Sequence, residues 1–237
     1  MDAVIRTHDD DGVRLLTLDR PEALNAFDSA LYREAGTAIE AARTDDAVHV
    51  LVVTGAGRAF SAGQDLKELE RLAAGEQIES GFPVLLDALC TFDKPIVAAV
   101  NGVAIGIGFT MLAHCDLVIA AESARFRTPF ASLGVAPEAA SSYLFPLRMG
   151  WQRAARVLFT DAWLSAAEAV EHGIALEQCP DDAVVSRALE LARTIASAPL
   201  GSLRAIKATM LAGQSDAVAA ARAREDAAFA QLLGFEW

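Results

Sequence analysis

The chain has 237 residues, of which 53% are apolar and 22% are charged, and its net charge is −12 with an isoelectric point near 4.7. This length and apolar content are enough for one large hydrophobic core, with or without a small appendage, and they argue against disorder. The acidic charge argues against nucleic acids and polybasic membrane contacts as partners.

Strand and helix patterns alternate through the first half of the chain. An amphipathic helix is predicted over residues 23–43, where Leu24, Phe27 and Leu31 begin an apolar stripe. The predicted strands cover residues 12–19, 48–55, 95–102 and 116–121, and shorter helical patterns cover residues 66–73 and 83–92. This β-α-β rhythm predicts a parallel α/β core.

Residues 96–113 are compatible in length with a membrane-spanning helix, because these 18 residues carry no charge. The segment begins with β-branched residues and is interrupted by Asn101–Gly102. We therefore expect a buried strand, a turn and a buried helix.

Helical patterns dominate after about residue 140. Ser165 and Glu168 form a predicted capping box, and Gly173 is the expected end of that helix. The last predicted helix, residues 216–233, ends in the apolar sequence LLGF. Its apolar face is expected to be buried, either against the core or against a neighbouring subunit.

The cysteines, the histidines and the absence of several known motifs argue against a disulfide framework, a metal site and several classes of enzyme. Cys90, Cys115 and Cys179 are far apart and odd in number, which is typical of reduced, buried thiols in a cytoplasmic protein. The acidic N-terminal segment does not resemble a signal peptide. The four histidines lack metal-ligand spacing, and dinucleotide, nucleotide-phosphate, serine-hydrolase and zinc-protease motifs are missing from the sequence.

Two glycine-bearing turns and one isolated acid remain as candidate site elements. FSAGQDL (60–66) and NGVAIGIG (101–108) each look like a strand-to-helix turn, whose free amides suit a developing oxyanion; either alone is also explained as an ordinary tight turn. In LGVAPEAASS, Glu138 is the one charged residue, and the local pattern fits a surface turn as well as a pocket acid.

Taken together, these stretches resemble the crotonase, or enoyl-CoA hydratase/isomerase, superfamily. The resemblance rests on RPEALNAFD, FSAGQDLKEL, KPIVAAVNGVAIGIG, CDLVIAAESARFRTPFASLG and LSAAEAVEHGIA, in this order. It implies an α/β fold with a β-β-α spiral core over residues 1–195 and a C-terminal helical trimerisation region over residues 196–237. It also implies acyl-CoA substrates, a role in fatty acid metabolism, no metal or further cofactor, and a cytoplasmic homotrimer or dimer of trimers.

The family position of the oxyanion hole falls on the backbone amides of Gln64 and Ile107. Many members have glycine where Ile107 stands, but the amide and not the side chain performs this role. The two glutamates that hydratases use correspond here to Thr110 and Phe130. Neither can activate water, so ordinary hydratase activity is not expected.

PEAASS (137–142) resembles the PEG-x-SS motif of the peroxisomal-type Δ3,Δ2-enoyl-CoA isomerases, with Ala139 in place of glycine. This assigns Glu138 as the single acid/base, which would move a proton from C2 to C4 through a dienolate. Apolar neighbours such as Phe130, Leu133 and Val135 are expected to raise its pKa. The alternatives are hydration, dienoyl isomerisation, thioester hydrolysis, or a non-catalytic acyl-CoA binder with Glu138 in solvent.

The resemblance also suggests the residues that bind substrate. They are Glu22, Ala23, Leu24, Ala62, Gly63, Asp65, Leu66, Gly106 and Phe130. Asp65 alternatively caps the helix that follows it. Lys67, Arg204 and Lys207 are candidates for the CoA phosphates, although solvated surface charge explains them equally well.

Overall fold

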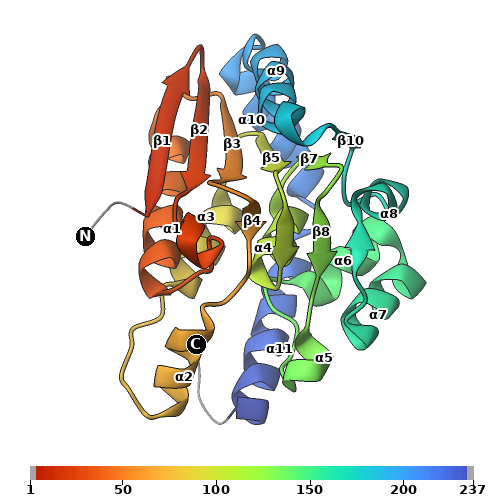
Figure 1. Ribbon diagram of the computed structural model, residues 1–237. Coiled ribbons are helices and arrows are strands. Elements are labelled where there is room, and N and C mark those ends of the chain that lie inside the picture. The colour runs from red at the N-terminus through yellow and green to blue at the C-terminus, as the bar shows by residue number, and fades with distance from the viewer. Residues whose placement is uncertain (1–3, 234–237) are drawn as a thin grey trace.

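The computed structural model describes residues 4–233, whose strands form two sheets (Figure 1). The larger sheet contains, in spatial order, β1 (Ile5–Asp10), β2 (Val13–Leu18), β3 (Val50–Gly55), β5 (Ile96–Val100), β7 (Leu117–Ala121) and β10 (Glu177–Cys179). Its pairs are parallel except β1 with β2, which is antiparallel. The smaller sheet contains β4 (Ala59–Ser61), β6 (Val103–Ile105), β8 (Arg125–Arg127) and β9 (Leu164–Ser165).

The chain crosses from the larger sheet to the smaller sheet three times in succession, and each crossing is followed by a helix. The three passes are β3–β4–α2 (Leu66–Ala73), β5–β6–α4 (Ile107–Thr110) and β7–β8–α5 (Phe130–Leu133). This confirms the predicted α/β fold built from β-β-α turns. Because β4, β6 and β8 are parallel, their carboxyl ends lie at one edge, and the segments that follow them meet there.

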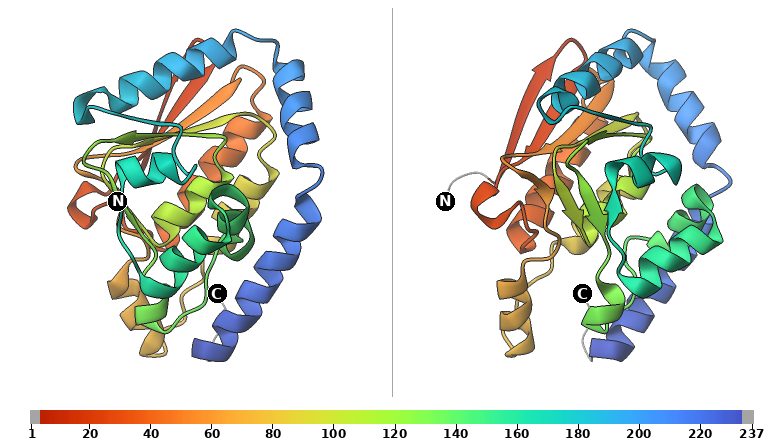
Figure 2. Two further views of the ribbon diagram at one scale, coloured as in Figure 1. Left: turned by 90° about the vertical axis from the view of Figure 1, so that its right-hand side faces the viewer. Right: turned by 45° about the vertical axis from the view of Figure 1, so that its right-hand side comes forward.

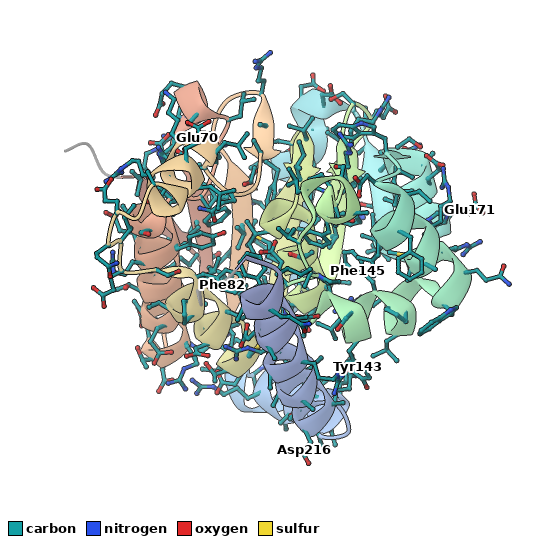
Figure 3. The ribbon with its side chains drawn as sticks, turned by 90° about the horizontal axis from the view of Figure 1, so that it is seen from below. Glu70, Phe82, Tyr143, Phe145, Glu171 and Asp216 are labelled. Carbon is teal, nitrogen blue, oxygen red and sulfur yellow. The ribbon has the colours of Figure 1, made fainter. Side chains whose placement is uncertain are left out.

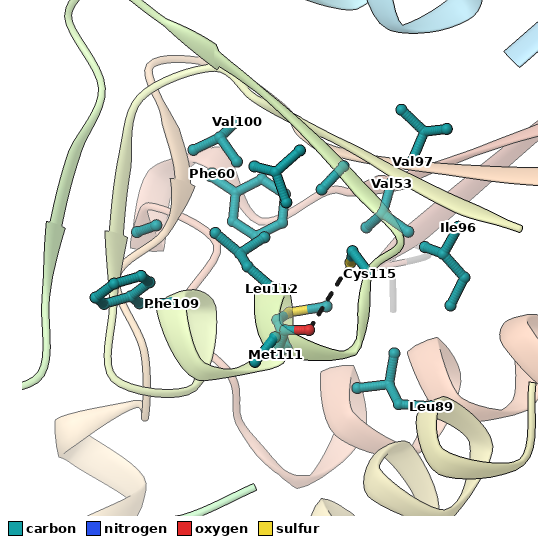
Figure 4. Packing of buried hydrophobic residues seen from close by; sticks show 14 of the residues in the cluster. Val53, Phe60, Leu89, Ile96, Val97, Val100, Phe109, Met111, Leu112 and Cys115 are labelled. Atoms are coloured by element: carbon teal, nitrogen blue, oxygen red, sulfur yellow. Dashed lines mark hydrogen bonds between the residues drawn. The ribbon is translucent and has the colours of Figure 1, made fainter. Parts of the chain in front are cut away.

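The core lies between the sheets and their covering helices. All residues of β3 and β5 are buried, as expected for central parallel strands. Helix α9 (Val184–Ala196) packs across the larger sheet, and α1 (Ser29–Thr44) packs against α3 (Phe82–Thr91) (Figure 2). Figure 4 shows Val53, Val97 and Leu112 in this core.

The cysteines are free, as expected, but only Cys115 is fully buried; Cys90 and Cys179 are half-buried. Residues 96–113 contain a buried strand, β5, and buried helical turns, α4 and the 3-10 turn η2 (Met111–His114), as predicted, but the strand β6 between them was not predicted. Within residues 4–233, no helix is long and apolar enough to cross a membrane.

The C-terminal helices wrap around the outside of the molecule. Helix α10 (Leu200–Leu211) descends from the level of α9, and α11 (Ser215–Leu233) continues along the body, where it packs on α6 (Ser141–Met149) (Figure 2). Figure 3 shows α11 from below, with Asp216 at its first turn. One stripe of α11 is buried at Ala221, Glu225 and Phe229. This chain's own α6 therefore covers one stripe of that helix, and most of its remaining described residues are exposed or half-buried.

Part of the expected C-terminal pattern falls outside the described residues, since Gly234 and Phe235 of LLGF lie beyond residue 233. The boundary between the spiral core and the C-terminal helical region, placed between residues 195 and 196, stays a prediction.

The capping box is confirmed: Ser165 and Glu168 bond reciprocally at the start of α8 (Ala166–Glu171), and Gly173 follows with a φ of +77°.

The prediction of one helix over residues 23–43 is wrong at its start. Leu24 and Asn25 have φ angles of 53° and 55°, and α1 begins only at Ser29, after the capping residue Asp28. The reason is the fully buried Asn25 side chain, which donates to the carbonyl oxygens of Ala56 and Ala59. These non-local hydrogen bonds favour the left-handed turn over helix at this point.

Three further expectations need correction. The mostly exposed, polar strand β1 has no apolar pattern that predicts it. NGVAIGIG is not a direct strand-to-helix turn, because β6 lies between Asn101 and the helix. Helical segments dominate after about residue 140 as predicted, but the short strands β9 and β10, which add edges to both sheets, were not predicted. The remaining helical segments are η1 (Pro21–Ala23), α7 (Trp151–Thr160) and η3 (Asp181–Ala183).

Candidate active site

A cavity of about 380 Å³ lies at the edge where β4, β6 and β8 end. Its walls come from the β4–α2 and β6–α4 turns, the segment around α5 and the last helix. The lining residues are Ala62, Gly63, Gln64, Leu66, Leu69, Ile105, Gly106, Ile107, Arg127, Pro129, Phe130, Ser132, Leu133, Val135, Ala136, Glu138 and Phe229. Glu138 is the one acidic residue among these described walls.

The first turn brings Gln64 to the wall of the cavity. Gly63 has a φ of +87°, and a Cβ there would lie 2.7 Å from the carbonyl oxygen of Ile105, so the position requires glycine. The strand-like bridge to Phe27 uses the carbonyl of Gly63 and the amide of Asp65. Among residues 4–233 the Gln64 amide donates to no acceptor, which leaves it available to a ligand.

The second turn presents the amide of Ile107. Gly106 has a φ of +52° and donates its own amide to the carbonyl of Arg127 at 2.9 Å. Ile107 is the first residue of α4, so its N–H has no acceptor within the helix, and none is found elsewhere in the described chain. A Cβ on Gly63 would lie 3.6 Å from the Gly106 Cα atom, so the two turns touch.

Glu138 lies beside these two turns. Its Oε1 is 3.9 Å from the position of a Cβ on Gly106, and the Thr110 hydroxyl donates to the same oxygen at 3.5 Å. Burial raises the pKa of Glu138 to about 8, and the negative charge of Glu225 adds to this rise, while the Thr110 hydrogen bond opposes it. A carboxyl with such a pKa can both take and return a proton near neutral pH.

The walls around Glu138 are largely apolar, as expected for Phe130, Leu133 and Val135, which all line the cavity. Phe130 is 6% exposed and Leu133 is 53% exposed, so the cavity is open on the Leu133 side. Thr110 is buried and bonds Glu138, which places it at the site without supplying a second carboxylate.

Comparison with known proteins agrees with this geometry. The family model described as "Enoyl-CoA hydratase/isomerase" matches residues 8–234. The chain belongs to the enoyl-CoA hydratase/isomerase family. It is 36% identical over 209 residues to a 1,2-epoxyphenylacetyl-CoA isomerase of Escherichia coli K12, covering 86% of this chain and 80% of that protein.

Two further family members show the same relation. Enoyl-CoA delta isomerase 2 of Rattus norvegicus is 38% identical over 201 residues, which are 83% of this chain and 51% of that longer protein. A crystal structure of an enoyl-CoA hydratase/isomerase from Pseudoalteromonas atlantica T6c superposes with a TM-score of 0.93 at 35% identity, covering 98% of this chain and 92% of that one. Other relatives are named as hydratases. Family membership alone therefore does not decide between isomerisation and hydration.

Within this family site, most of the expected residues line one cavity. The residues brought together are Gln64, Ile107, Glu138, Ala62, Gly63, Leu66, Gly106 and Phe130. Glu22, Ala23 and Leu24 do not line it, and their substrate-binding role stays a prediction. Asp65 accepts from the Lys67 amide at 3.0 Å and from the Arg20 guanidinium at 3.1 Å. The capping alternative for Asp65 therefore fits the structure.

Of the basic candidates for the CoA phosphates, Lys207 is not available. Its side chain is 6% exposed, pairs with Asp116 at 2.9 Å and donates to the carbonyl of Lys94. Arg204 pairs with two aspartates, and Lys67 is exposed on α2.

The structure adds three residues that the sequence did not single out. The buried Tyr32 hydroxyl donates to Gln64 Oε1 at 2.9 Å and thereby fixes the Gln64 side chain. Burial raises the pKa of Tyr32, and the Glu138 charge adds to this. Phe229 of α11 closes one wall of the cavity. Glu225, four residues earlier on α11, bonds to the segment that carries Glu138.

Proposed function

We propose that the protein is a Δ3,Δ2-enoyl-CoA isomerase, which moves the double bond of 3-enoyl-CoA thioesters to the 2-position. The observation that supports it best is Glu138, a single carboxyl with a raised pKa that shares one cavity with the free amides of Gln64 and Ile107. Coenzyme A is part of the substrate, and no further cofactor or metal is proposed.

The reaction needs one base and one oxyanion site. The Glu138 carboxylate removes a proton from C2, and the electron pair moves through the thioester to its oxygen while the 3-double bond remains in conjugation. The Gln64 and Ile107 amides donate to that dienolate oxygen. Glu138 then returns the proton to C4, and the double bond comes to lie between C2 and C3. Because C2 and C4 flank one carbon, one side chain can serve both positions.

Hydration is the main alternative, because some relatives are named as hydratases. It would need a group that holds and deprotonates water in addition to the acid that protonates carbon. Thr110 and Phe130 stand where such a group is expected, and Glu138 is the one carboxyl among the described cavity walls. The arrangement therefore favours isomerisation.

The proposal is tested by offering 3-hexenoyl-CoA and 2-hexenoyl-CoA to the purified protein in parallel. We expect the first to be converted to the 2-enoyl thioester and the second to gain no water. Absorbance of the conjugated thioester and mass spectrometry measure the two outcomes. Rapid hydration of 2-hexenoyl-CoA, or binding of both thioesters without turnover, would contradict the proposal.

We also propose that the protein acts in the cytoplasm, in fatty acid metabolism, as a homotrimer or a dimer of trimers. The free cysteines suit a reducing compartment. Trp151 and Phe159 of α7 are each 73% exposed, which suits an assembly that covers them. Sedimentation equilibrium of the 25.0 kDa chain distinguishes a trimer or hexamer from a monomer.

A further inference from the structure

We infer that Glu225 of α11 is a positioning residue for Glu138. It binds the backbone of the segment that carries Glu138, called here the catalytic segment (residues 138–142), and its negative charge opposes ionisation of the Glu138 carboxyl. This inference rests on the proposed function of Glu138. Glu225 lies 87 positions after Glu138 in the chain, on the helix that closes the cavity through Phe229.

The contact between Glu225 and the catalytic segment is specific. Glu225 is 5% exposed, its Oε2 accepts from the Ala140 amide at 2.7 Å, and its Oε1 accepts from the Ser142 amide at 2.8 Å. Both carboxylate oxygens are thus used on backbone donors. Hydrogen bonds from buried amides to a charged group are among the stronger ones in proteins.

The segment needs such a partner because its backbone is strained. Ala139 and Ala140 both have a φ of 55°, a left-handed conformation that is unfavourable for residues with a side chain. This turn points the Ala140 and Ser142 amides toward α11 and leaves the preceding Glu138 at the cavity. Without an acceptor, the two amides would be unsatisfied in the interior.

A second hydrogen bond, from His114, holds the other side of the same turn. The carbonyl of Ala139 lies 2.8 Å from His114 Nε2, which must be the donor because a carbonyl oxygen only accepts. Burial lowers the pKa of His114 to about 4, so its ring is neutral near pH 7. The turn is therefore fixed by a neutral donor on η2 and by an acidic acceptor on α11.

Glu225 does not act as a second catalytic acid. It is not among the cavity walls, and its two oxygens face the backbone rather than the substrate space. The groups that act on Glu138 are the Thr110 hydroxyl from α4 and the Glu225 charge from α11, and the Tyr32 phenol from α1 feels its charge. Burial is the largest cause of the raised pKa of Glu138, and among these neighbouring groups it is the Glu225 charge that adds to the rise.

The two roles of Glu225 are separated by two conservative variants. Glu225→Gln keeps the size of the side chain but removes its charge, so the protonation midpoint of Glu138 should fall below that of the wild type. Glu225→Asp keeps the charge but shortens the side chain. We expect it to leave the midpoint nearer that of the wild type while kcat falls about tenfold with a smaller change in KM, because the turn is less firmly held.

The measurement combines kinetics with a readout that does not need activity. The pH profile of kcat/KM for 3-hexenoyl-CoA gives the midpoint of the essential base in the free enzyme. Side-chain carboxyl resonances of 13C-labelled glutamate give the Glu138 midpoint directly, assigned by their loss in Glu138→Gln. Asp226→Asn is the matched control, because it removes the same charge from an exposed neighbour on α11.

If NMR gives the same protonation midpoint for Glu138 in Glu225→Gln and in the wild type, the proposed effect of the Glu225 charge on Glu138 is overturned. Wild-type kinetics in Glu225→Asp and Glu225→Gln would overturn the positioning role. Thermal unfolding of each variant shows whether a loss of rate reflects global destabilisation. If the wild type fails to isomerise 3-hexenoyl-CoA, the proposed function fails, and the NMR midpoints still decide whether Glu225 controls Glu138.

Discussion

Replacement of Glu138 by glutamine should lower kcat for 3-hexenoyl-CoA isomerisation by about 1,000- to 10,000-fold. The reason is that, in the proposed mechanism, the same carboxyl removes the C2 proton and delivers the C4 proton, and no other carboxyl among the described residues lines the cavity. Glutamine has nearly the same shape but cannot accept and return a proton. Binding of the thioester should change little, since the Gln64 and Ile107 amides and the apolar walls remain.

The assay follows the absorbance of the conjugated product under single-turnover conditions, together with a calorimetric Kd for a saturated acyl-CoA. Glu34→Gln is a suitable control, because Glu34 is exposed on α1 outside the cavity. Retention of more than a tenth of the wild-type rate in Glu138→Gln would show that another group performs the proton transfer.

The second large effect concerns the turn that holds the Gln64 amide. In Gly63→Ala the new Cβ would lie 2.7 Å from the Ile105 carbonyl oxygen, so the turn must move and the Gln64 amide with it. Loss of one oxyanion donor typically lowers kcat about 100- to 1,000-fold. We expect a loss of this size with a smaller change in KM, because the donor acts mainly on the charge of the dienolate.

Gly75→Ala is a closely matched control for this change. Gly75 has the same φ of +87°, but a Cβ there meets nothing within 4 Å. Both variants therefore carry the cost of an alanine in the left-handed region, roughly 1–2 kcal/mol, and only Gly63→Ala disturbs the oxyanion site. Similar kcat values for the two variants, with comparable unfolding temperatures, would refute the role of the Gln64 amide.

Local patterns in the sequence were sufficient to predict the central strands, whereas the donor role of the two glycine-bearing turns came from the family resemblance. The runs at 48–55 and 95–102 have the continuous apolar character of buried parallel strands, and they form β3 and β5. Gly63 and Gly106 have positive φ angles, and the family position of the oxyanion hole falls on the amides of the residues that follow them, Gln64 and Ile107. Glu138 was assigned through the resemblance of PEAASS to the isomerase motif, because its local pattern fits a surface turn equally well.

Residues whose roles come from distant contacts could not be predicted in this manner. Glu225 lies in the polar sequence ARAREDAA, which is typical of a solvated helix face, and only packing of α11 on α6 buries it. Lys207 reads as a surface cation until its pairing with Asp116 is seen. The start of α1 was misplaced because Asn25 is held by Ala56 and Ala59, more than 30 positions away.

The central claim is that one carboxyl carries one proton from C2 to C4 inside the cavity. It is tested most directly with 3-hexenoyl-CoA that bears deuterium at both C2 positions, converted in ordinary water and analysed by mass spectrometry after a single turnover. We predict that a measurable fraction of the 2-enoyl product retains both deuterium atoms, one of them at C4. Product that has lost one deuterium in every molecule, with the C4 hydrogen drawn entirely from water, would contradict the account.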